Sequence, residues 1–174
     1  MRVYHLLSAK YAIENLKNQR LKISLFDDLN DPFELLSVEL SKPTNRKKFL
    51  ELKKDINEKK GVLCFSRSWK NPVLWSHYGD KHKGICLGFD IPDTLLEKVI
   101  YKGERLPIDV EKELNEGNLN GRMEKKLLIT KFEHWSYEEE ERVILQLVEA
   151  DKREIEKTEL YFKKFDDNLK IKEI

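Results

Sequence analysis

Apolar and polar residues alternate over short stretches of the chain, a period of two that is typical of half-buried β-strands. Leu21, Ile23 and Leu25, for example, are separated by Lys22 and Ser24. Other short runs are almost wholly apolar, as expected of strands buried on both faces. The pattern therefore predicts strands at 3–7, 21–25, 62–66, 85–89, 99–101, 142–148, 161–165 and 169–174.

Helical spacing of apolar residues appears between these strands. Ser8 is placed to cap a helix running through Leu16, because its hydroxyl can accept a free first-turn N–H. Residues 45–60 place Phe49, Leu52 and Ile56 on one face of a basic helix, and Gly61 is placed to end it. Asn71-Pro72 predicts an N-cap and first helical position, and further helices are expected near 93–97 and over 109–133, with a break at 115–121.

Short strands with scattered helices predict an α+β fold: one domain over residues 1–174, with a mixed or antiparallel sheet and flanking helices. The order of elements does not repeat strand–helix–strand, which disfavours a doubly wound sheet. Neither GxGxxG nor GxxxxGK[ST] occurs, so the sequence gives no support to a Rossmann fingerprint or a P-loop.

Charged residues make up 37% of the chain, but 33 Lys and Arg nearly balance 32 Asp and Glu. A net charge of +1 argues against a dedicated nucleic-acid binder, which usually carries a basic excess. Two cysteines do not make a disulfide framework, no paired Cys/His spacing suggests a zinc site, and no apolar run resembles a signal peptide or a membrane span. We expect a cytoplasmic protein.

Four clusters place polar and aromatic groups beside apolar strands: Tyr4-His5, Asn30–Glu34, the motifs Cys64–Ser66, Trp75–Gly79 and His82–Gly84 taken together, and Trp135–Arg142. Each also has a purely structural interpretation. A histidine on a strand is commonly a packed residue, Asn30 and Asp31 can close their own turn, and Phe33 can anchor that turn. His77 and His82 resemble a metal pair, but no third ligand is evident, so no metal is expected.

The acidic run before the last long strand is the most suggestive cluster. Glu138 and Glu140 share a face if this segment is extended, and paired carboxylates suit glycosidic chemistry, in which an acid stabilises an oxocarbenium-like centre. A solvated charge run, or an ion pair between Glu140 and Arg142, is the structural alternative.

Taken in order, these clusters resemble the bacterial family known as domain of unknown function 2971. The resemblance rests on Tyr4-His5, Arg20–Ser24, Asn30–Glu34, Cys64–Ser66, Trp75–Tyr78, His82–Gly84, Gly88–Asp90, Val99–Tyr101 and Trp135–Glu138 with Glu140 and Arg142. The layout is more remotely similar to the ADP-ribosyltransferase superfamily, although the second-strand motif is not a clear Ser-Thr-Ser.

The more remote resemblance implies an NAD-dependent ADP-ribosyltransferase or NAD glycohydrolase, with NAD as substrate, in a toxin or phage-defence context. It implies Glu140 as the catalytic carboxylate, Glu138 as a second catalytic residue that selects or activates the acceptor, and His5 as a third that contacts the ribose or diphosphate. Further residues expected to hold NAD are Tyr78, Trp75, Ser66, Asn30 and Arg142, and other expected pocket residues are Asp31, Phe33, His77 and His82.

Two other functions fit the same residues. A non-enzymatic nucleotide- or nucleic-acid-binding module would use the aromatic rings to stack bases and the basic helix to meet phosphates. A hydrolytic nuclease would use His77 or His82 together with acids. The acceptor, a protein or a nucleic acid, is not indicated by the sequence.

Overall fold

The computed structural model describes residues 1–31, 34–35, 43–106, 121–155 and 157–174. Its helices are α1 (Ala9–Asn18), α2 (Pro43–Lys59), α3 (Pro72–His77) and α5 (Gly121–Ile129), with 3₁₀ turns η1 (Phe26–Asp28), η2 (Asp93–Leu95), η3 (Glu133–Glu138) and η4 (Leu147–Glu149). Its strands are β1 (Arg2–Leu7), β2 (Arg20–Ile23), β3 (Lys60–Ser66), β4 (Ile85–Asp90), β5 (Glu97–Lys98), β6 (Ile100–Lys102), β7 (Thr130–Phe132), β8 (Glu140–Gln146), β9 (Asp151–Ile155), β10 (Thr158–Lys164) and β11 (Lys170–Glu173). The predicted α+β class is confirmed.

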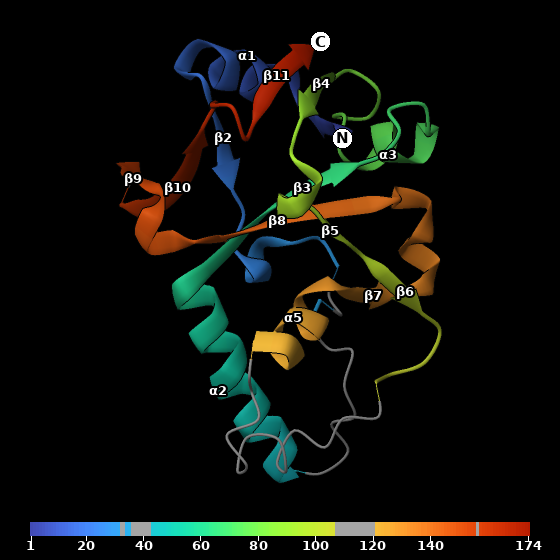
Figure 1. Cartoon of the computed structure of the whole chain (residues 1–174), viewed down its shortest axis with the longest axis vertical. Coiled ribbons are helices and arrows are strands. Elements are labelled where there is room, and N and C mark those ends of the chain that lie inside the picture. Colours follow the sequence, from blue (N-terminus) through green and yellow to red (C-terminus); the bar gives the residue numbers. More distant parts are fainter. Residues whose placement is uncertain (32–33, 36–42, 107–120, 156) are drawn as a thin grey trace.

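The main sheet has six strands in the order β11-β4-β1-β3-β8-β5, all paired antiparallel. A second sheet has the order β2-β10-β9, and β6 pairs in parallel with β7. Helix α2 projects away from the main sheet, while α1 lies near β11 and β4 at the opposite end (Figure 1). Strand β8 crosses the middle of the molecule between these two ends.

Strand β3 separates two hydrophobic clusters because its side chains alternate between two faces. Leu63 and Phe65 belong to a cluster built mainly from the two larger sheets and α1. Val62 belongs to a second cluster with residues of α2 and α5, and Cys64 packs against it. The face that carries Val62 and Cys64 is therefore apolar at one end, and it becomes polar towards Ser66.

Several local predictions are confirmed. The Asn71 side chain accepts a hydrogen bond from the Val73 N–H at 2.9 Å, and Pro72 opens α3, as the Asn-Pro pair predicted. Helix α2 buries Phe49 and Ile56 and half-buries Leu52. Ser8 does precede α1, but its side chain makes no capping hydrogen bond, so that part of the prediction is wrong.

Other local predictions are wrong for identifiable reasons. Residues 130–132 form β7 rather than the end of a helix, because they pair with β6. Strand β9, with the sequence DKREI, was not predicted because it is mostly exposed and lacks apolar alternation. Gly61 does not end α2, because it lies inside β3, after the helix has ended. Its lack of a side chain instead allows β3 to pack closely against Ile23.

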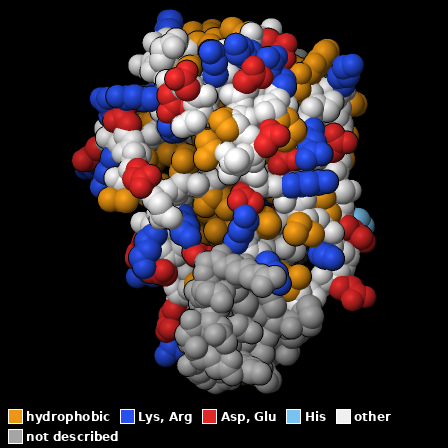
Figure 2. Space-filling view, in the orientation of Figure 1, with side chains coloured by type: hydrophobic (Ala, Val, Ile, Leu, Met, Phe, Trp, Pro, Cys, Tyr) orange, Lys and Arg blue, Asp and Glu red, His pale blue; other side chains and the backbone are white. Residues whose placement is uncertain are grey.

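The surface carries both signs of charge side by side. Lys, Arg, Asp and Glu are interspersed over the face in Figure 2, with hydrophobic side chains between them. Within the described residues, no helix combines the length and the apolar character that crossing a bilayer requires.

Candidate active site

A cavity of about 300 Å³ opens beside β3 where β1 and β2 diverge. Strand β1 pairs with β3 only at Tyr4–Ser66, and Ser24 bridges to Val62 further along the same edge. Between these two points the Cys64 carbonyl accepts a hydrogen bond from a side chain, the His5 ring, at 2.8 Å. The cavity is therefore built into a break in strand pairing.

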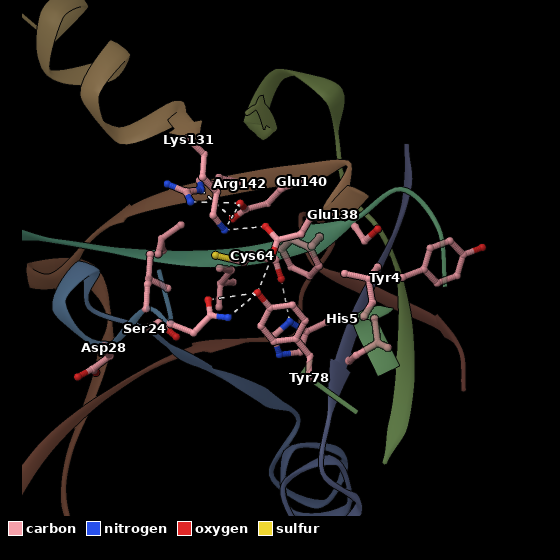
Figure 3. Close-up of a pocket in the computed structure, with 18 of the residues that line it drawn as sticks. Tyr4, His5, Ser24, Asp28, Cys64, Tyr78, Lys131, Glu138, Glu140 and Arg142 are labelled. Carbon is pink, nitrogen blue, oxygen red and sulfur yellow. Dashed lines mark hydrogen bonds and ion pairs between the residues drawn. The ribbon is translucent and has the colours of Figure 1, made fainter. Parts of the chain in front are cut away.

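Segments that are far apart in sequence line this cavity (Figure 3). Its walls come from β1, the end of β2, the turn after η1, β3, α3 and the β7–β8 region. The polar lining residues are Tyr4, His5, Lys22, Ser24, Asp28, Asn30, Cys64, Ser66, Tyr78, Lys131, Glu138, Glu140 and Arg142. No residue of the basic helix α2 is among them.

Arg142 is fully buried at the centre of an ionic network. Its guanidinium donates to Glu140 at 2.8 and 3.1 Å and to Glu34 at 2.6 and 3.1 Å. A fifth hydrogen bond, at 2.7 Å, goes to the Leu128 carbonyl, so all five N–H groups are used. The ion pair between Glu140 and Arg142, the structural alternative for this site, is thus present.

Lys131 joins the two acids of the cavity wall. Its Nζ lies 2.6 Å from Glu138 and 3.3 Å from Glu140, and its side chain is buried. The acids Glu34, Glu138 and Glu140 face the two bases Lys131 and Arg142, so the cluster holds one more acidic group than basic groups. Its excess negative charge lies at the cavity wall.

The two carboxylates have different electrostatic environments. Burial alone would raise the pKa of Glu140, but the charges of Arg142 and Lys131 outweigh it and lower the pKa to about 2. Burial raises the pKa of Glu138, and Lys131 only partly offsets that effect. Glu140 is therefore a firmly ionised carboxylate, whereas Glu138 is easier to protonate.

Tyr78 connects Glu138 to the mouth of the cavity. Its hydroxyl donates to Glu138 and accepts from the Asn30 amide at 3.0 Å. Burial, together with the charge of Glu138, raises the pKa of Tyr78, which keeps the phenol neutral and able to donate.

His5 presents its second ring nitrogen as an acceptor. Nδ1 faces the Cys64 carbonyl, so Nδ1 carries the proton and the neutral ring leaves a lone pair on Nε2. Burial lowers the pKa of His5 and so favours the neutral ring, and the hydrogen bond to Cys64 opposes this effect only in part. His5 and Glu140 line the same cavity, as the transferase hypothesis requires.

The remaining predicted site residues divide into two groups. Ser66 and Asn30 line the cavity, together with His5, Tyr78, Glu138, Glu140 and Arg142. Trp75, Asp31, His77 and His82 do not line it: Trp75 donates from its indole to the Trp69 carbonyl, Asp31 is buried outside the cavity, and His77 and His82 are exposed. Phe33 lies outside the described residues.

The convergence of Glu138 and Glu140 has a different cause from the predicted one. Glu138 ends η3, Glu139 adopts a left-handed conformation with φ 45°, and Glu140 begins β8, so the segment is not extended. The turn at Glu139 brings both carboxylates to Lys131. Lys131 was not predicted as a site residue, although a lysine in the largely apolar run LLITKF was a usable signal, and Glu34 was predicted only as part of the Asn30–Glu34 cluster.

A comparison with protein families finds a match to the part of the chain that supplies several of these residues. The family described as "Protein of unknown function (DUF2971)" matches residues 74–143. The resemblance predicted from the sequence is confirmed over this segment. The DUF2971 segment supplies Tyr78, Lys131, Glu138, Glu140 and Arg142, while His5, Asn30 and Cys64 lie outside it.

No curated protein matches the chain, and no solved structure matches it. Among the described residues, no group of three or more His, Cys, Asp or Glu is arranged to hold a metal ion.

Proposed function

We propose that this protein binds NAD at the cavity and breaks the nicotinamide–ribose bond, releasing nicotinamide by hydrolysis or by ADP-ribosyl transfer. The observation that supports the proposal most is the meeting of Glu138, His5 and Tyr78 at one cavity. A cavity of about 300 Å³ is at the lower end of the range of about 300–1,000 Å³ for small-molecule pockets. That size suits the nicotinamide–ribose end of the dinucleotide.

The chemistry needs negative charge beside the sugar. When the bond between ribose C1′ and the nicotinamide nitrogen breaks, its electron pair leaves with nicotinamide and positive charge develops on the ribose. A fixed carboxylate stabilises that charge more in the transition state than in the bound substrate. The ionic network at the cavity wall has one more acidic group than basic groups, so it supplies the negative charge that this step requires.

Glu138 is better placed for this contact than Glu140. Glu140 accepts three N–H bonds from the two cations, which neutralise much of its charge. Glu138 accepts from one cation and from the neutral Tyr78 hydroxyl. We therefore assign the contact with the sugar to Glu138. Glu140 instead holds the side chains of Lys131 and Arg142 in position.

His5 supplies the acceptor for the proton. A water molecule or an acceptor hydroxyl adds to ribose C1′ and loses a proton, and the lone pair on His5 Nε2 takes it. The hydrogen bond from Nδ1 to the Cys64 carbonyl fixes the ring for this role.

The experiment is incubation of pure protein with NAD, with nicotinamide release followed by chromatography. Glu138→Gln removes the charge but keeps the shape, so we expect release to fall by about 100-fold or more. Glu139→Gln, at the exposed neighbouring position, is the matched control and should turn over like the wild type. Absence of release, together with absence of a thermal shift on adding NAD, would overturn the proposal.

A nucleotide-binding protein without catalysis is the second candidate. The surroundings of Glu138 favour it, because burial raises the pKa of this carboxyl and the ion pair with Lys131 neutralises part of its charge, and both effects weaken its contribution to catalysis. Tight binding of NAD without any release of nicotinamide would support this candidate instead.

A further inference from the structure

A group of three aromatic rings lies next to the cavity, and the proposed chemistry does not use it. His77, which ends α3, packs against Trp135 and Tyr137 of η3, and we call these three residues the ring cluster. The His77 and Tyr137 rings are stacked, with centroids 6.2 Å apart and planes 23° from parallel. Trp135 lies 6.2 Å from His77 and 6.0 Å from Tyr137.

The ring cluster is continuous with the cavity wall through two lining residues. The Tyr78 ring lies 6.0 Å from the His77 ring, and Lys131 Nζ lies 4.8 Å from the centroid of Trp135. The cluster is also held in place, since the Asn71 amide donates to the Tyr137 carbonyl at 2.9 Å. His77 is exposed, and Trp135 and Tyr137 are half-buried, so flat apolar surface remains available to a ligand.

We propose that the ring cluster stacks the adenine base of the dinucleotide, a role that rests on the proposed function. A cavity of about 300 Å³ takes one nucleotide half, so the other half has to lie on neighbouring surface. Planar bases stack on aromatic side chains with little dependence on sequence or on hydrogen bonds. The preformed stack of His77 on Tyr137 offers such a surface beside the cavity mouth.

The test compares two substrates that share the same scissile bond. NAD carries the adenine half, whereas nicotinamide mononucleotide lacks it. His77→Ala should raise KM for NAD about tenfold, as expected for the loss of one stacking partner, and should change KM for the mononucleotide much less. His77→Phe keeps a flat ring and should restore KM for NAD.

His134→Ala is the matched control, because His134 is an exposed ring of the same η3 turn that contacts Phe132 rather than the ring cluster. It should leave both substrates unaffected. If His77→Ala weakens both substrates equally, or neither, the inference is wrong while the proposed function stands.

If the wild type releases nicotinamide from neither substrate, the proposed function fails. Binding of AMP then tests whether the ring cluster stacks an adenine base. Calorimetric binding of AMP to the wild type that is lost in His77→Ala and kept in His77→Phe would support the stacking role. Absence of AMP binding, or binding that His77→Ala leaves unchanged, would overturn it.

Discussion

Arg142 has the most demanding environment of any single residue at the site. A buried guanidinium is tolerated only when its donors are paired, because desolvating an unpaired charge costs several kcal/mol. Glu34 and Glu140 pair with it on two sides and the Leu128 carbonyl takes the remaining donor. Arg142 thereby ties Glu34 to β8, and it holds Glu140 in its orientation.

Replacing Arg142 with Met should destabilise the fold by about 3–5 kcal/mol, because the buried acids Glu34 and Glu140 would both lose the guanidinium and Glu140 would keep only Lys131. Urea denaturation measures this change. Arg153→Met removes an exposed arginine whose partner is Asp151, and it should cost at most about 1 kcal/mol. Equal costs for the two variants would contradict the structural importance of the Arg142 network.

At the scale of elements, the approach of β2 to β3 positions one wall of the cavity. Ser24 and Val62 exchange backbone hydrogen bonds at 3.0 and 2.8 Å, next to Gly61. A Cβ on Gly61 would lie 2.3 Å from Ile23 Cγ2 and 3.1 Å from the Ser24 carbonyl oxygen. The absence of a side chain at Gly61 therefore allows the contact between the two strands.

Gly61→Ala should lower stability by about 1–3 kcal/mol through overpacking of β3 against β2. Gly103→Ala is the control, since the added Cβ would meet only the flexible end of the Glu133 side chain. We expect this second change to stay within about 0.5 kcal/mol. Thermal unfolding of both variants tests the difference, and a Gly61→Ala protein as stable as Gly103→Ala would refute the packing argument.

At the scale of the whole molecule, the chain is nearly neutral, but the charges of its buried ionic cluster do not balance. The net charge is +1, and charges of both signs mix over the visible surface, yet the buried cluster has one more acidic group than basic groups. Because the pKa of Glu140 is lowered, its contribution to stability is present above its ordinary pKa of 4.5 and is lost as the pH falls towards 2. The raised pKa of Glu138 acts with the opposite sign, since its contribution is lost as the pH rises above 4.5.

Between pH 4.5 and about 2 the wild type should lose up to about 3 kcal/mol of stability through Glu140. Glu140→Gln cannot titrate, so its free energy of unfolding should change less over this range, from a lower starting value at neutral pH. Denaturant unfolding at several pH values measures both slopes. Parallel slopes for the two proteins would show that Glu140 is not the titrating group.

Local patterns in the sequence were sufficient for most of the elements. Strand alternation located β2, Asn71-Pro72 located the start of α3, and helical spacing identified the buried face of α2, because each signal depends on residues a few positions apart. The polar edge strand β9 and the short strand β7 lacked such a signal, and only pairing with a partner strand decided their conformation.

The sequence by itself determined the α+β composition of the chain, most of its helices and strands, and the candidate residues that the DUF2971 resemblance grouped together. Only the tertiary structure decided which of these residues meet. Pairing along β1, β3 and β8 brings His5, Cys64 and Arg142 into one wall although many residues separate them, and Glu34 and Lys131 complete the charge balance from two other segments. The physical reason is that burying a charge requires partners close in space, and distance in space depends on strand order rather than on spacing along the chain.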